Sequence, residues 1–184
     1  MHINFFSRKK YKAAREIKMI LMDVDGTLTD GLVYLLPDGE EIKAYNVQDG
    51  LGILLARIAG LKAGVITGKI SGALKIRAEK LGLDEIHQGI LNKKVVLEEI
   101  VQKHNLNLEQ VAYIGDDLGD LEVMKSVGLA AAVANAHPAI KKVALYHCKA
   151  KGGDGAVREF IEFILRAQGK WASVQDRASD LRKP

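Results

Sequence analysis

The chain has 184 residues, of which 48% are apolar and 27% are charged, the proportions of an ordinary globular domain with a buried core. Aromatic residues make up only 5%, which argues against a base-stacking nucleic-acid platform, and the longest apolar run, 129–134, is far too short to span a bilayer. The lone cysteine, Cys148, excludes an intramolecular disulfide, and the N-terminus lacks a secretory signal pattern, so we expect a cytoplasmic protein.

The first predicted element is a basic N-terminal helix or leader over residues 1–16. Residues 1–18 carry six Lys or Arg side chains and one Glu, whereas the whole chain has a net charge of only +4. The positive charge therefore belongs to this segment and does not indicate a surface for nucleic acid. A solvated helix is the simplest interpretation, and contact with an acidic partner is the alternative.

From residue 17 to residue 170, apolar runs of strand length alternate with longer amphipathic stretches. This alternation predicts one doubly wound α/β domain with a mostly parallel, Rossmann-like sheet. The predicted strands are 17–22, 62–67, 85–87, 110–115, 129–133 and 144–147. The predicted helices are 48–59, 70–81, 92–104, 117–126 and 137–142, followed by an amphipathic helix that Asp154 caps and that reaches residue 165.

A predicted β-hairpin interrupts this alternation directly after the first strand. The segments 32–36 and 40–46 flank Pro37-Asp38-Gly39, whose proline and glycine favour a turn. Because the hairpin follows Asp25 closely, we expect it to project over that residue. At the other end of the chain, residues 171–184 are polar and predict a C-terminal tail that frays.

Two acidic segments follow predicted strands. Asp23-Val24-Asp25-Gly26-Thr27 ends the first strand, and Gly115-Asp116-Asp117-Leu118-Gly119-Asp120 ends the fourth. In an open α/β sheet, ligands bind beyond the carboxyl ends of the strands where the winding reverses, and a strand order of 3-2-1-4-5 makes these two ends neighbours there. Converging carboxylates repel one another unless a cation joins them, and oxygen-only ligands suit Mg²⁺.

Other common motifs fail on inspection. A phosphate-binding P-loop would need a glycine in place of Ala63 and a hydroxyl in place of Ile70, and a dinucleotide fingerprint would need a glycine in place of Leu55. The segment 23–34 lacks the closing glutamate of a calcium-binding loop. The five histidines show no metal-ligand spacing.

Two further positions extend the acidic pattern toward phosphate chemistry, which needs donors for the phosphoryl oxygens. Thr67-Gly68 ends the second strand with a hydroxyl and a turn, and Lys93 opens the helix after the third strand. Taken singly, these are ordinary strand-end and helix-surface residues. Their order, Asp-x-Asp-Gly-Thr, Thr-Gly, Lys and Gly-Asp-Asp-x-x-Asp, resembles the haloacid dehalogenase superfamily over about residues 16–170.

This resemblance implies a Mg²⁺-dependent phosphatase that acts through an aspartyl-phosphate. Asp23 is then the nucleophile, and Asp25 is the acid that protonates the leaving oxygen and later activates water. The implied metal ligands are Asp23, the backbone carbonyl of Asp25, and Asp116. Thr67, Gly68 and Lys93 are the implied phosphate-binding residues.

The intervals between the motifs leave no room for a cap domain, so the site is open unless a neighbouring subunit covers it. Within the superfamily, the chain resembles the 3-deoxy-D-manno-octulosonate 8-phosphate phosphatase family, a capless homotetramer of lipopolysaccharide sugar synthesis. The segments that carry this likeness are 23–31, 46–53, 88–89 with 92–93, 111–118, 136–138 and 152–159. The implied substrate contacts are Asn46, Val47, Gln48, Asp49, Gly50, Lys69 and Arg77, although a helix cap at Asp49 and a solvated charge at Arg77 are equally compatible with the sequence.

The sequence departs from that family's pattern at four recognition positions. Gln48 and Lys69 replace arginines, Leu54 replaces a basic residue, and Asp154 stands where arginine is frequent. Lysine cannot reproduce the planar, two-pronged grip of arginine on a carboxylate. A nine-carbon ulosonic or sialic acid 9-phosphate, or a broad range of sugar phosphates, is therefore the nearest alternative substrate.

Two interpretations from other classes compete with an enzyme. In a phospho-accepting receiver domain the acceptor aspartate ends the third strand, but that strand ends here in His87-Gln88. A non-catalytic, phosphatase-like assembly module is the second, and the full set of Asp23, Asp25, Lys93 and Asp116 argues against it.

Overall fold

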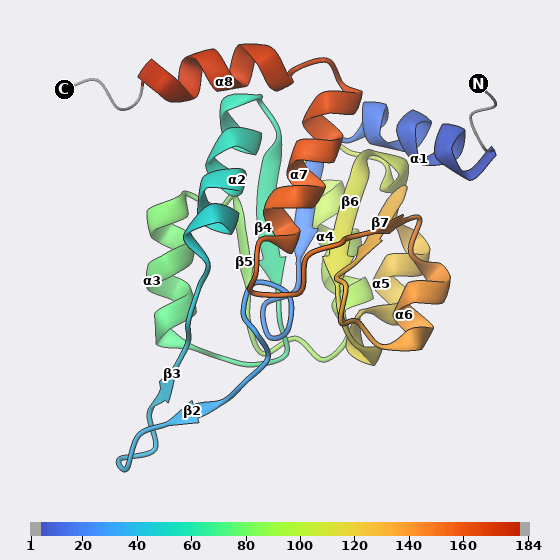
Figure 1. Ribbon diagram of the computed structural model, residues 1–184. Helices are drawn as coiled ribbons and strands as arrows, with labels where there is room; N and C mark the ends of the chain where they lie inside the picture. Colours follow the sequence, from blue (N-terminus) through green and yellow to red (C-terminus); the bar gives the residue numbers. More distant parts are fainter. Residues whose placement is uncertain (1–4, 181–184) are drawn as a thin grey trace.

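The central sheet has six parallel strands, namely β1 (Met19–Met22), β4 (Lys62–Ile66), β5 (Glu85–His87), β6 (Val111–Gly115), β7 (Leu129–Ala132) and β8 (Tyr146–His147). The computed structural model describes residues 5–180. The strand order is β5-β4-β1-β6-β7-β8, which confirms the predicted doubly wound topology (Figure 1). Every residue of β1, β6 and β7 is buried, because helices cover both faces of the sheet, and nearly all of their side chains are apolar.

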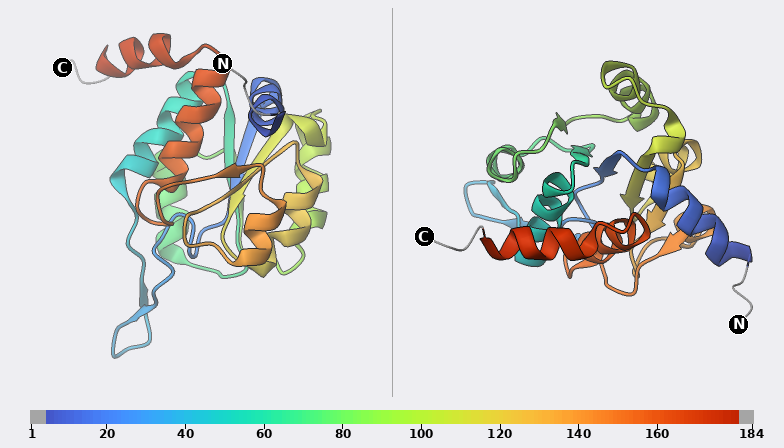
Figure 2. Two further views of the ribbon diagram at one scale, coloured as in Figure 1. Left: turned by 45° about the vertical axis from the view of Figure 1, so that its right-hand side comes forward. Right: turned by 90° about the horizontal axis from the view of Figure 1, so that it is seen from above.

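The helices form two layers around the sheet (Figures 1 and 2). On one face α2 packs against α7, with α1 against α7 and α3 beside α2, whereas α4, α5 and α6 lie side by side on the other face. Their bounds are α1 (Phe5–Glu16), α2 (Val47–Ile58), α3 (Gly72–Leu81), α4 (Lys93–Lys103), α5 (Leu121–Ser126), α6 (Pro138–Val143) and α7 (Ala156–Ala167), with 3-10 turns η1 (Leu108–Gln110) and η2 (Leu118–Asp120). No helix within residues 5–180 is both long enough and apolar enough to cross a membrane.

The N-terminus of α7 differs from the prediction. Asp154 does not cap this helix; its N-cap position is Gly155, which has a left-handed backbone. The carboxylate of Asp49 in α2 accepts hydrogen bonds from the backbone N–H groups of Gly155 (3.3 Å) and Arg158 (2.8 Å) instead. The cap therefore comes from a neighbouring helix, and it fixes α7 to α2.

The C-terminal segment is helical where a fraying tail was predicted. Residues Trp171–Asp180 form α8, which packs on α2 and α7. Val174 is buried, and the guanidinium of Arg177 donates to the backbone carbonyl of Ile58 at 2.9 Å. A buried apolar side chain, a bond to the end of α2 and the contact of the Trp171 ring with two arginines of α7 hold this short polar helix in place. Residues 1–4 of the predicted leader and 181–184 of the predicted tail lie outside the described part of the chain.

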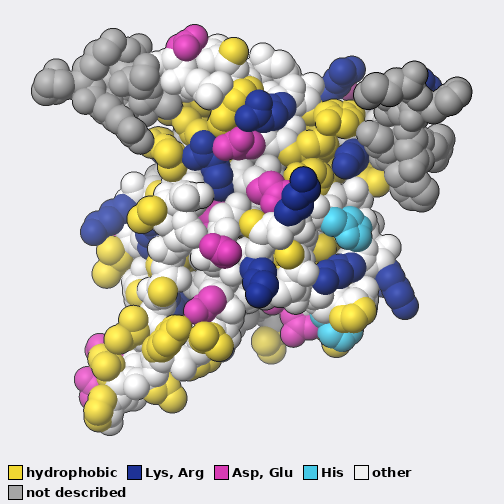
Figure 3. Space-filling view, in the orientation of Figure 1, with side chains coloured by type: hydrophobic (Ala, Val, Ile, Leu, Met, Phe, Trp, Pro, Cys, Tyr) yellow, Lys and Arg dark blue, Asp and Glu magenta, His cyan; other side chains and the backbone are white. Residues whose placement is uncertain are grey.

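The predicted hairpin is present, although its strands are short. β2 (Tyr34–Leu35) pairs antiparallel with β3 (Glu41–Ile42), and the hairpin extends beyond the carboxyl ends of the sheet strands (Figure 1). Its apolar side chains face solvent, among them Leu35, which is 67% exposed, and they form a patch on the surface (Figure 3).

Strand β5 is joined to α4 by a group of charged residues, which we call the Glu85 cluster: Glu85, His87, Lys103 and His104. The buried Glu85 carboxylate lies 2.8 Å from His87 Nε2, 2.6 Å from His104 Nε2 and 2.7 Å from Lys103 Nζ. Burial alone would raise the pKa of Glu85, but these three neighbours outweigh it and lower that pKa to about 2. The cluster therefore stabilises the attachment of an edge strand.

Candidate active site

The two acidic segments meet at the carboxyl edge of the sheet, as the strand order predicts. β1 pairs with β4 on one side and with β6 on the other, so the winding direction reverses at β1. Asp23 directly follows β1, Asp116 directly follows β6, and Thr67 directly follows β4. Lys93, the first residue of α4, extends its side chain to the same place. Four residues that are far apart in sequence thus surround one point.

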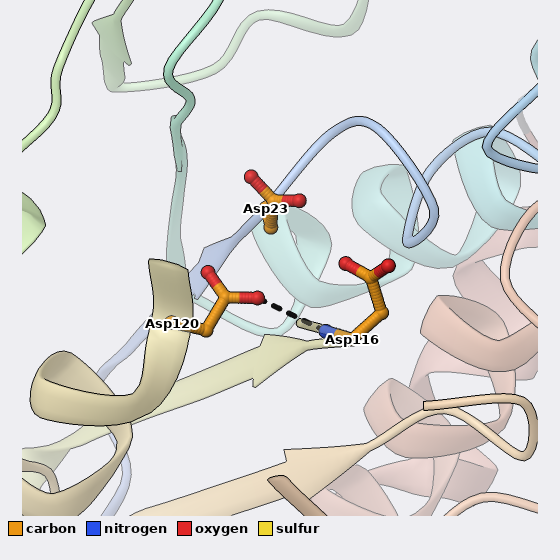
Figure 4. A group of neighbouring side chains, drawn as sticks. All are labelled: Asp23, Asp116 and Asp120. Carbon is orange, nitrogen blue, oxygen red and sulfur yellow. Dashed lines mark hydrogen bonds between the residues drawn. The ribbon is translucent and has the colours of Figure 1, made fainter. Parts of the chain in front are cut away.

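Three carboxylates crowd this point. One oxygen from each of Asp23, Asp116 and Asp120 lies within 4.8 Å of the other two (Figure 4). Burial and the Asp120 charge raise the pKa of Asp23 to about 6, and burial with the Asp23 and Asp120 charges raises the pKa of Asp116 to about 8. Both shifts express the cost of placing like charges together away from water, and a bound cation would remove that cost. A donor set of oxygens alone fits Mg²⁺.

Asp120 supports the other two carboxylates through a network of donors. Its Oδ2 accepts hydrogen bonds from the backbone N–H groups of Asp116 (3.0 Å, dashed in Figure 4) and Asp117 (3.4 Å). Its Oδ1 accepts from Lys93 Nζ at 2.7 Å and from the Tyr113 hydroxyl at 2.8 Å. Asp120 thereby shapes the loop after β6, which leaves Asp23 and Asp116 as the carboxylates best placed to face a cation.

Lys93 is the buried cation of the site. Its Nζ donates to Asp23 Oδ1 at 2.5 Å, to Asp120 Oδ1 at 2.7 Å and to the Tyr113 hydroxyl at 3.3 Å. Burial opposes its charge, but Asp23 and Asp120 outweigh burial and raise the pKa of Lys93. Lys93 is therefore a fixed positive charge directly beside the Asp23 carboxylate.

Asp25 lies two residues beyond Asp23 on the loop after β1. Its Oδ1 accepts a hydrogen bond from Lys43 Nζ, and Lys43 belongs to the segment between β3 and α2. The hairpin connection thus reaches Asp25, as the sequence predicted, but the lysine that makes the contact was not among the predicted site residues. Nothing in the sequence pattern marks Lys43, because the hairpin register alone does not tell which of its side chains points inward.

Glycine is required at position 26 for two reasons. Gly26 has a φ of +90°, and a β-carbon there would lie 2.0 Å from Asp116 Oδ2. The loop after β1 thus approaches the second acidic segment more closely than any side chain allows. On its other side the Gly26 carbonyl packs against Gly152, where a β-carbon would be 1.7 Å from that oxygen.

Two of the predicted phosphate-binding residues, Thr67 and Gly68, directly follow β4. Thr67 is buried, its backbone N–H donates to the His87 carbonyl at 2.9 Å, and its own carbonyl accepts from Ile90 N–H at 3.0 Å. These bonds hold the Thr67-Gly68 turn in place between β4 and the loop after β5. Lys69 is further out, with Nζ 3.7 Å from Glu41 Oε1 in β3.

The predicted substrate contacts at the start of α2 differ in their surroundings. Asn46 and Asp49 have structural roles in this chain: Asn46 Oδ1 caps α2 by accepting from Gln48 N–H (2.7 Å), and Asp49 caps α7. Val47 and Gln48 are exposed at the start of α2. Gly50 is the contact point for α3, because a β-carbon there would lie 2.2 Å from a terminal nitrogen of Arg77.

A small cavity between α2 and α3 lies next to this group and is lined in part by Tyr45, Asn46, Asp49 and Arg77. The Tyr45 hydroxyl is buried and has no hydrogen-bond partner among the described residues. Burial and the nearby Asp25 charge raise the pKa of Tyr45 to about 12. Sequence reasoning missed this tyrosine, as it missed Lys43 and Tyr113, and it placed Asp120 in the second acidic segment without giving it a role.

Comparison with known proteins agrees with this geometry. Residues 65–161 match the haloacid dehalogenase-like hydrolase family, a match that includes Thr67, Lys93 and Asp116 but begins after Asp23. The 3-deoxy-D-manno-octulosonate 8-phosphate phosphatase KdsC of Escherichia coli K12 is 43% identical over 157 residues, which cover 85% of this chain and 84% of the relative.

Two solved structures are similar over almost the whole chain. The 3-deoxy-D-manno-octulosonate 8-phosphate phosphatase from Yersinia pestis superposes with a TM-score of 0.88 at 43% identity, covering 89% of each chain. The enzyme of the same name from Moraxella catarrhalis, solved in complex with magnesium ion, phosphate ion and KDO, superposes with a TM-score of 0.90 at 38% identity, covering 96% of this chain and 99% of the other.

Proposed function

Since this chain belongs to the haloacid dehalogenase-like hydrolases, and within them to the 3-deoxy-D-manno-octulosonate 8-phosphate phosphatase family, we propose that it is a Mg²⁺-dependent phosphatase that releases phosphate from 3-deoxy-D-manno-octulosonate 8-phosphate. The observation that carries this proposal is the convergence of Asp23, Asp116 and Lys93 at the carboxyl edge of the sheet, where the winding direction reverses. The catalytic domain is residues 17–170, and the helices on either side of it pack on α7.

Asp23 is the nucleophile of the proposed reaction. Its carboxylate oxygen attacks the phosphorus, the sugar oxygen leaves, and an aspartyl-phosphate forms. Two anions must approach each other in this step, and Lys93, 2.5 Å from Asp23 Oδ1, neutralises part of their repulsion. Mg²⁺, held by Asp23, Asp116 and the backbone carbonyl of Asp25, would supply further positive charge beside the phosphoryl oxygens.

Asp25 carries the proton in both halves of the reaction. As an acid it protonates the departing sugar oxygen, and as a carboxylate it then removes a proton from the water that hydrolyses the aspartyl-phosphate. Its place two residues after Asp23, on the same loop, supports this role because proton transfer needs a group within hydrogen-bond reach of the leaving oxygen. Uncatalysed hydrolysis of phosphate monoesters is among the slowest biological reactions, so the reaction needs the acid–base residue Asp25 as well as the nucleophile Asp23.

Thr67 and Gly68 bind the phosphoryl oxygens together with Lys93. The turn after β4 is held rigidly by its backbone bonds to the loop after β5, which supports a preorganised set of donors. The sugar acid is recognised by residues at the start of α2 and by two basic side chains. The residues at the start of α2 are Asn46, Val47, Gln48, Asp49 and Gly50, and the basic side chains are Lys69 and Arg77. Asp49 would act indirectly in this set, since its carboxylate is already bonded to α7.

The nearest alternative substrate is a nine-carbon ulosonic or sialic acid 9-phosphate, or a range of sugar phosphates. Three departures from the family's pattern support this alternative substrate. Gln48 and Leu54 lack a positive charge, and Lys69 has a single ammonium where the family has the forked guanidinium of arginine. The reaction itself would be unchanged, since these positions are distinct from Asp23, Asp25 and Lys93.

The functional form is a homotetramer of cytoplasmic location, in which neighbouring copies complete each other's sites. The exposed apolar side chains of the hairpin support this proposal (Figure 3). They form a cluster of Leu32, Val33, Tyr34, Leu35 and Ile42 on the projecting hairpin, and a cluster of this kind is typical of a surface that another chain covers. The proposed product is a sugar acid used in lipopolysaccharide synthesis.

Phosphate release in the presence of Mg²⁺, measured on a panel of sugar phosphates, tests the activity and the substrate together. The proposal predicts that the eight-carbon acid phosphate has the highest kcat/KM. A higher value for the nine-carbon acid phosphate would favour the alternative, and equally low values for all compounds would contradict a dedicated enzyme. Light scattering of the native protein tests the assembly, because a fully active monomer would rule out shared sites.

A further inference from the structure

The side chain of Lys43 is largely buried and contacts Asp25, the residue that carries the proton in the proposed reaction. Its side chain is 7% exposed, and its Nζ donates to Asp25 Oδ1. Glu41 Oε2 is a second anionic partner, 4.0 Å from the same Nζ. Lysines are rarely buried unless their charge is paired, so this ammonium is held at a defined position by its two carboxylate neighbours.

Asp25, in contrast, is poorly confined by its own surroundings. Its side chain is 31% exposed and stands on the loop after β1, whereas Asp23 is buried and bonded to Lys93. A partly exposed carboxylate on a loop can occupy several rotamers, and each rotamer points the carboxylate in a different direction. Proton transfer to a leaving oxygen requires one of these directions, because the donor and acceptor must lie within hydrogen-bond distance.

We propose that Lys43 is a positioning residue that holds the Asp25 carboxylate in the direction required for proton transfer, a role that rests on the proposed phosphatase activity. The ammonium lies on the segment between β3 and α2, and it selects one orientation of Asp25 through a charge-assisted hydrogen bond. When Asp25 carries the proton, Glu41 remains within reach of Lys43 as its anionic partner.

A leaving-group comparison distinguishes this role from phosphate binding. An alkyl phosphate such as a sugar phosphate releases an alkoxide that must be protonated, whereas p-nitrophenyl phosphate releases a stable phenolate that leaves without an acid. Loss of a well-placed general acid therefore slows the first substrate much more than the second. A residue that binds the phosphoryl group, or that only stabilises the fold, affects both substrates alike.

The test uses Lys43→Met, which keeps the length and shape of the side chain but removes its charge. We expect kcat/KM for the best sugar phosphate of the panel to fall about 10- to 100-fold more than kcat/KM for p-nitrophenyl phosphate, within the range that general acid catalysis contributes. Lys43→Arg, which keeps the charge, should restore most of the wild-type ratio between the kcat/KM values for the sugar phosphate and for p-nitrophenyl phosphate. Lys43→Gln provides the same comparison if the methionine variant does not fold, as judged by circular dichroism.

Lys62→Met controls for the loss of a lysine–aspartate pair, because Lys62 also pairs with an aspartate (Asp84, 3.6 Å), although its side chain is more exposed and lies at the start of β4, at the other end of the sheet from the site. This variant should leave the ratio between the kcat/KM values for the two substrates unchanged. An equal loss on both substrates in Lys43→Met, or no loss on either, would overturn the role of Lys43 while leaving the phosphatase activity intact. A wild-type protein that releases no phosphate from any substrate would overturn both proposals at once.

Discussion

The substitution Gly26→Ala tests whether the close approach of the two acidic loops positions the metal ligands. A β-carbon at this position would lie 2.0 Å from Asp116 Oδ2 and 2.7 Å from its Cγ. Since non-bonded atoms keep at least ~3 Å apart, the Asp116 carboxylate or the loop must move by roughly 1 Å. Misplacing a metal ligand by such an amount should weaken Mg²⁺ binding about 10- to 100-fold. The left-handed backbone adds a loss of stability of about 1–2 kcal/mol.

Gly60→Ala is a matched control for the backbone contribution. Gly60 has a φ of +81°, and a β-carbon there would have no heavy atom within 4 Å, so alanine brings the same backbone strain without a collision. Both variants should lose similar stability in urea unfolding, but calorimetric titration should show weaker Mg²⁺ binding for Gly26→Ala alone. Equal Mg²⁺ affinity in the two variants would refute the idea that Gly26 is needed to place Asp116.

Three further predictions concern the residues that support the site. Asp49→Ala should lower the free energy of unfolding by about 2 kcal/mol, because two backbone N–H groups of α7 lose their acceptor; urea unfolding measures this loss. For the Glu85 cluster, the pKa of Glu85 is lowered on folding from 4.5 to about 2, so its stabilising contribution is complete above pH 4.5 and is lost as the pH falls toward 2. The stability difference between wild type and Glu85→Gln should therefore shrink, by on the order of 1–2 kcal/mol, as the pH falls from 4.5 toward 2, and a constant difference over that range would contradict this. Tyr113→Phe removes the hydroxyl that joins Lys93 and Asp120 and should reduce kcat about 10-fold, with little change in KM if the network acts on the chemical step.

The sheet and the meeting of the acidic segments could be predicted from the sequence because each depends on local patterns. Uninterrupted apolar runs identify β1, β6 and β7 as strands buried on both faces, and their alternation with helices fixes a parallel order. Once the order is known, Asp23 and Asp116 must be neighbours, since they follow adjacent strands. This part of the site needs no side-chain detail.

The remaining features depend on contacts between segments that no local pattern records. Asp49 caps α7, more than a hundred residues later in the chain, so its own helix gives no sign of that role. Lys43 reaches Asp25 only because the hairpin connection folds back over the loop after β1. The helix α8 was missed because its ordering relies on contacts of Trp171, Val174 and Arg177 with the rest of the fold rather than on an apolar stripe of its own.

The central claim is that Asp23 accepts the phosphoryl group, and trapping that group on the protein tests it most directly. In Asp25→Asn the base that activates water is missing, so the aspartyl-phosphate should accumulate when this variant is mixed with Mg²⁺ and p-nitrophenyl phosphate. Acid quenching followed by peptide mass spectrometry should then find one phosphoryl group on the peptide that contains Asp23, and none when Asp23→Asn is added to the variant. Phosphate release by an Asp23→Asn protein, or a phosphoryl group on any other residue, would contradict the account.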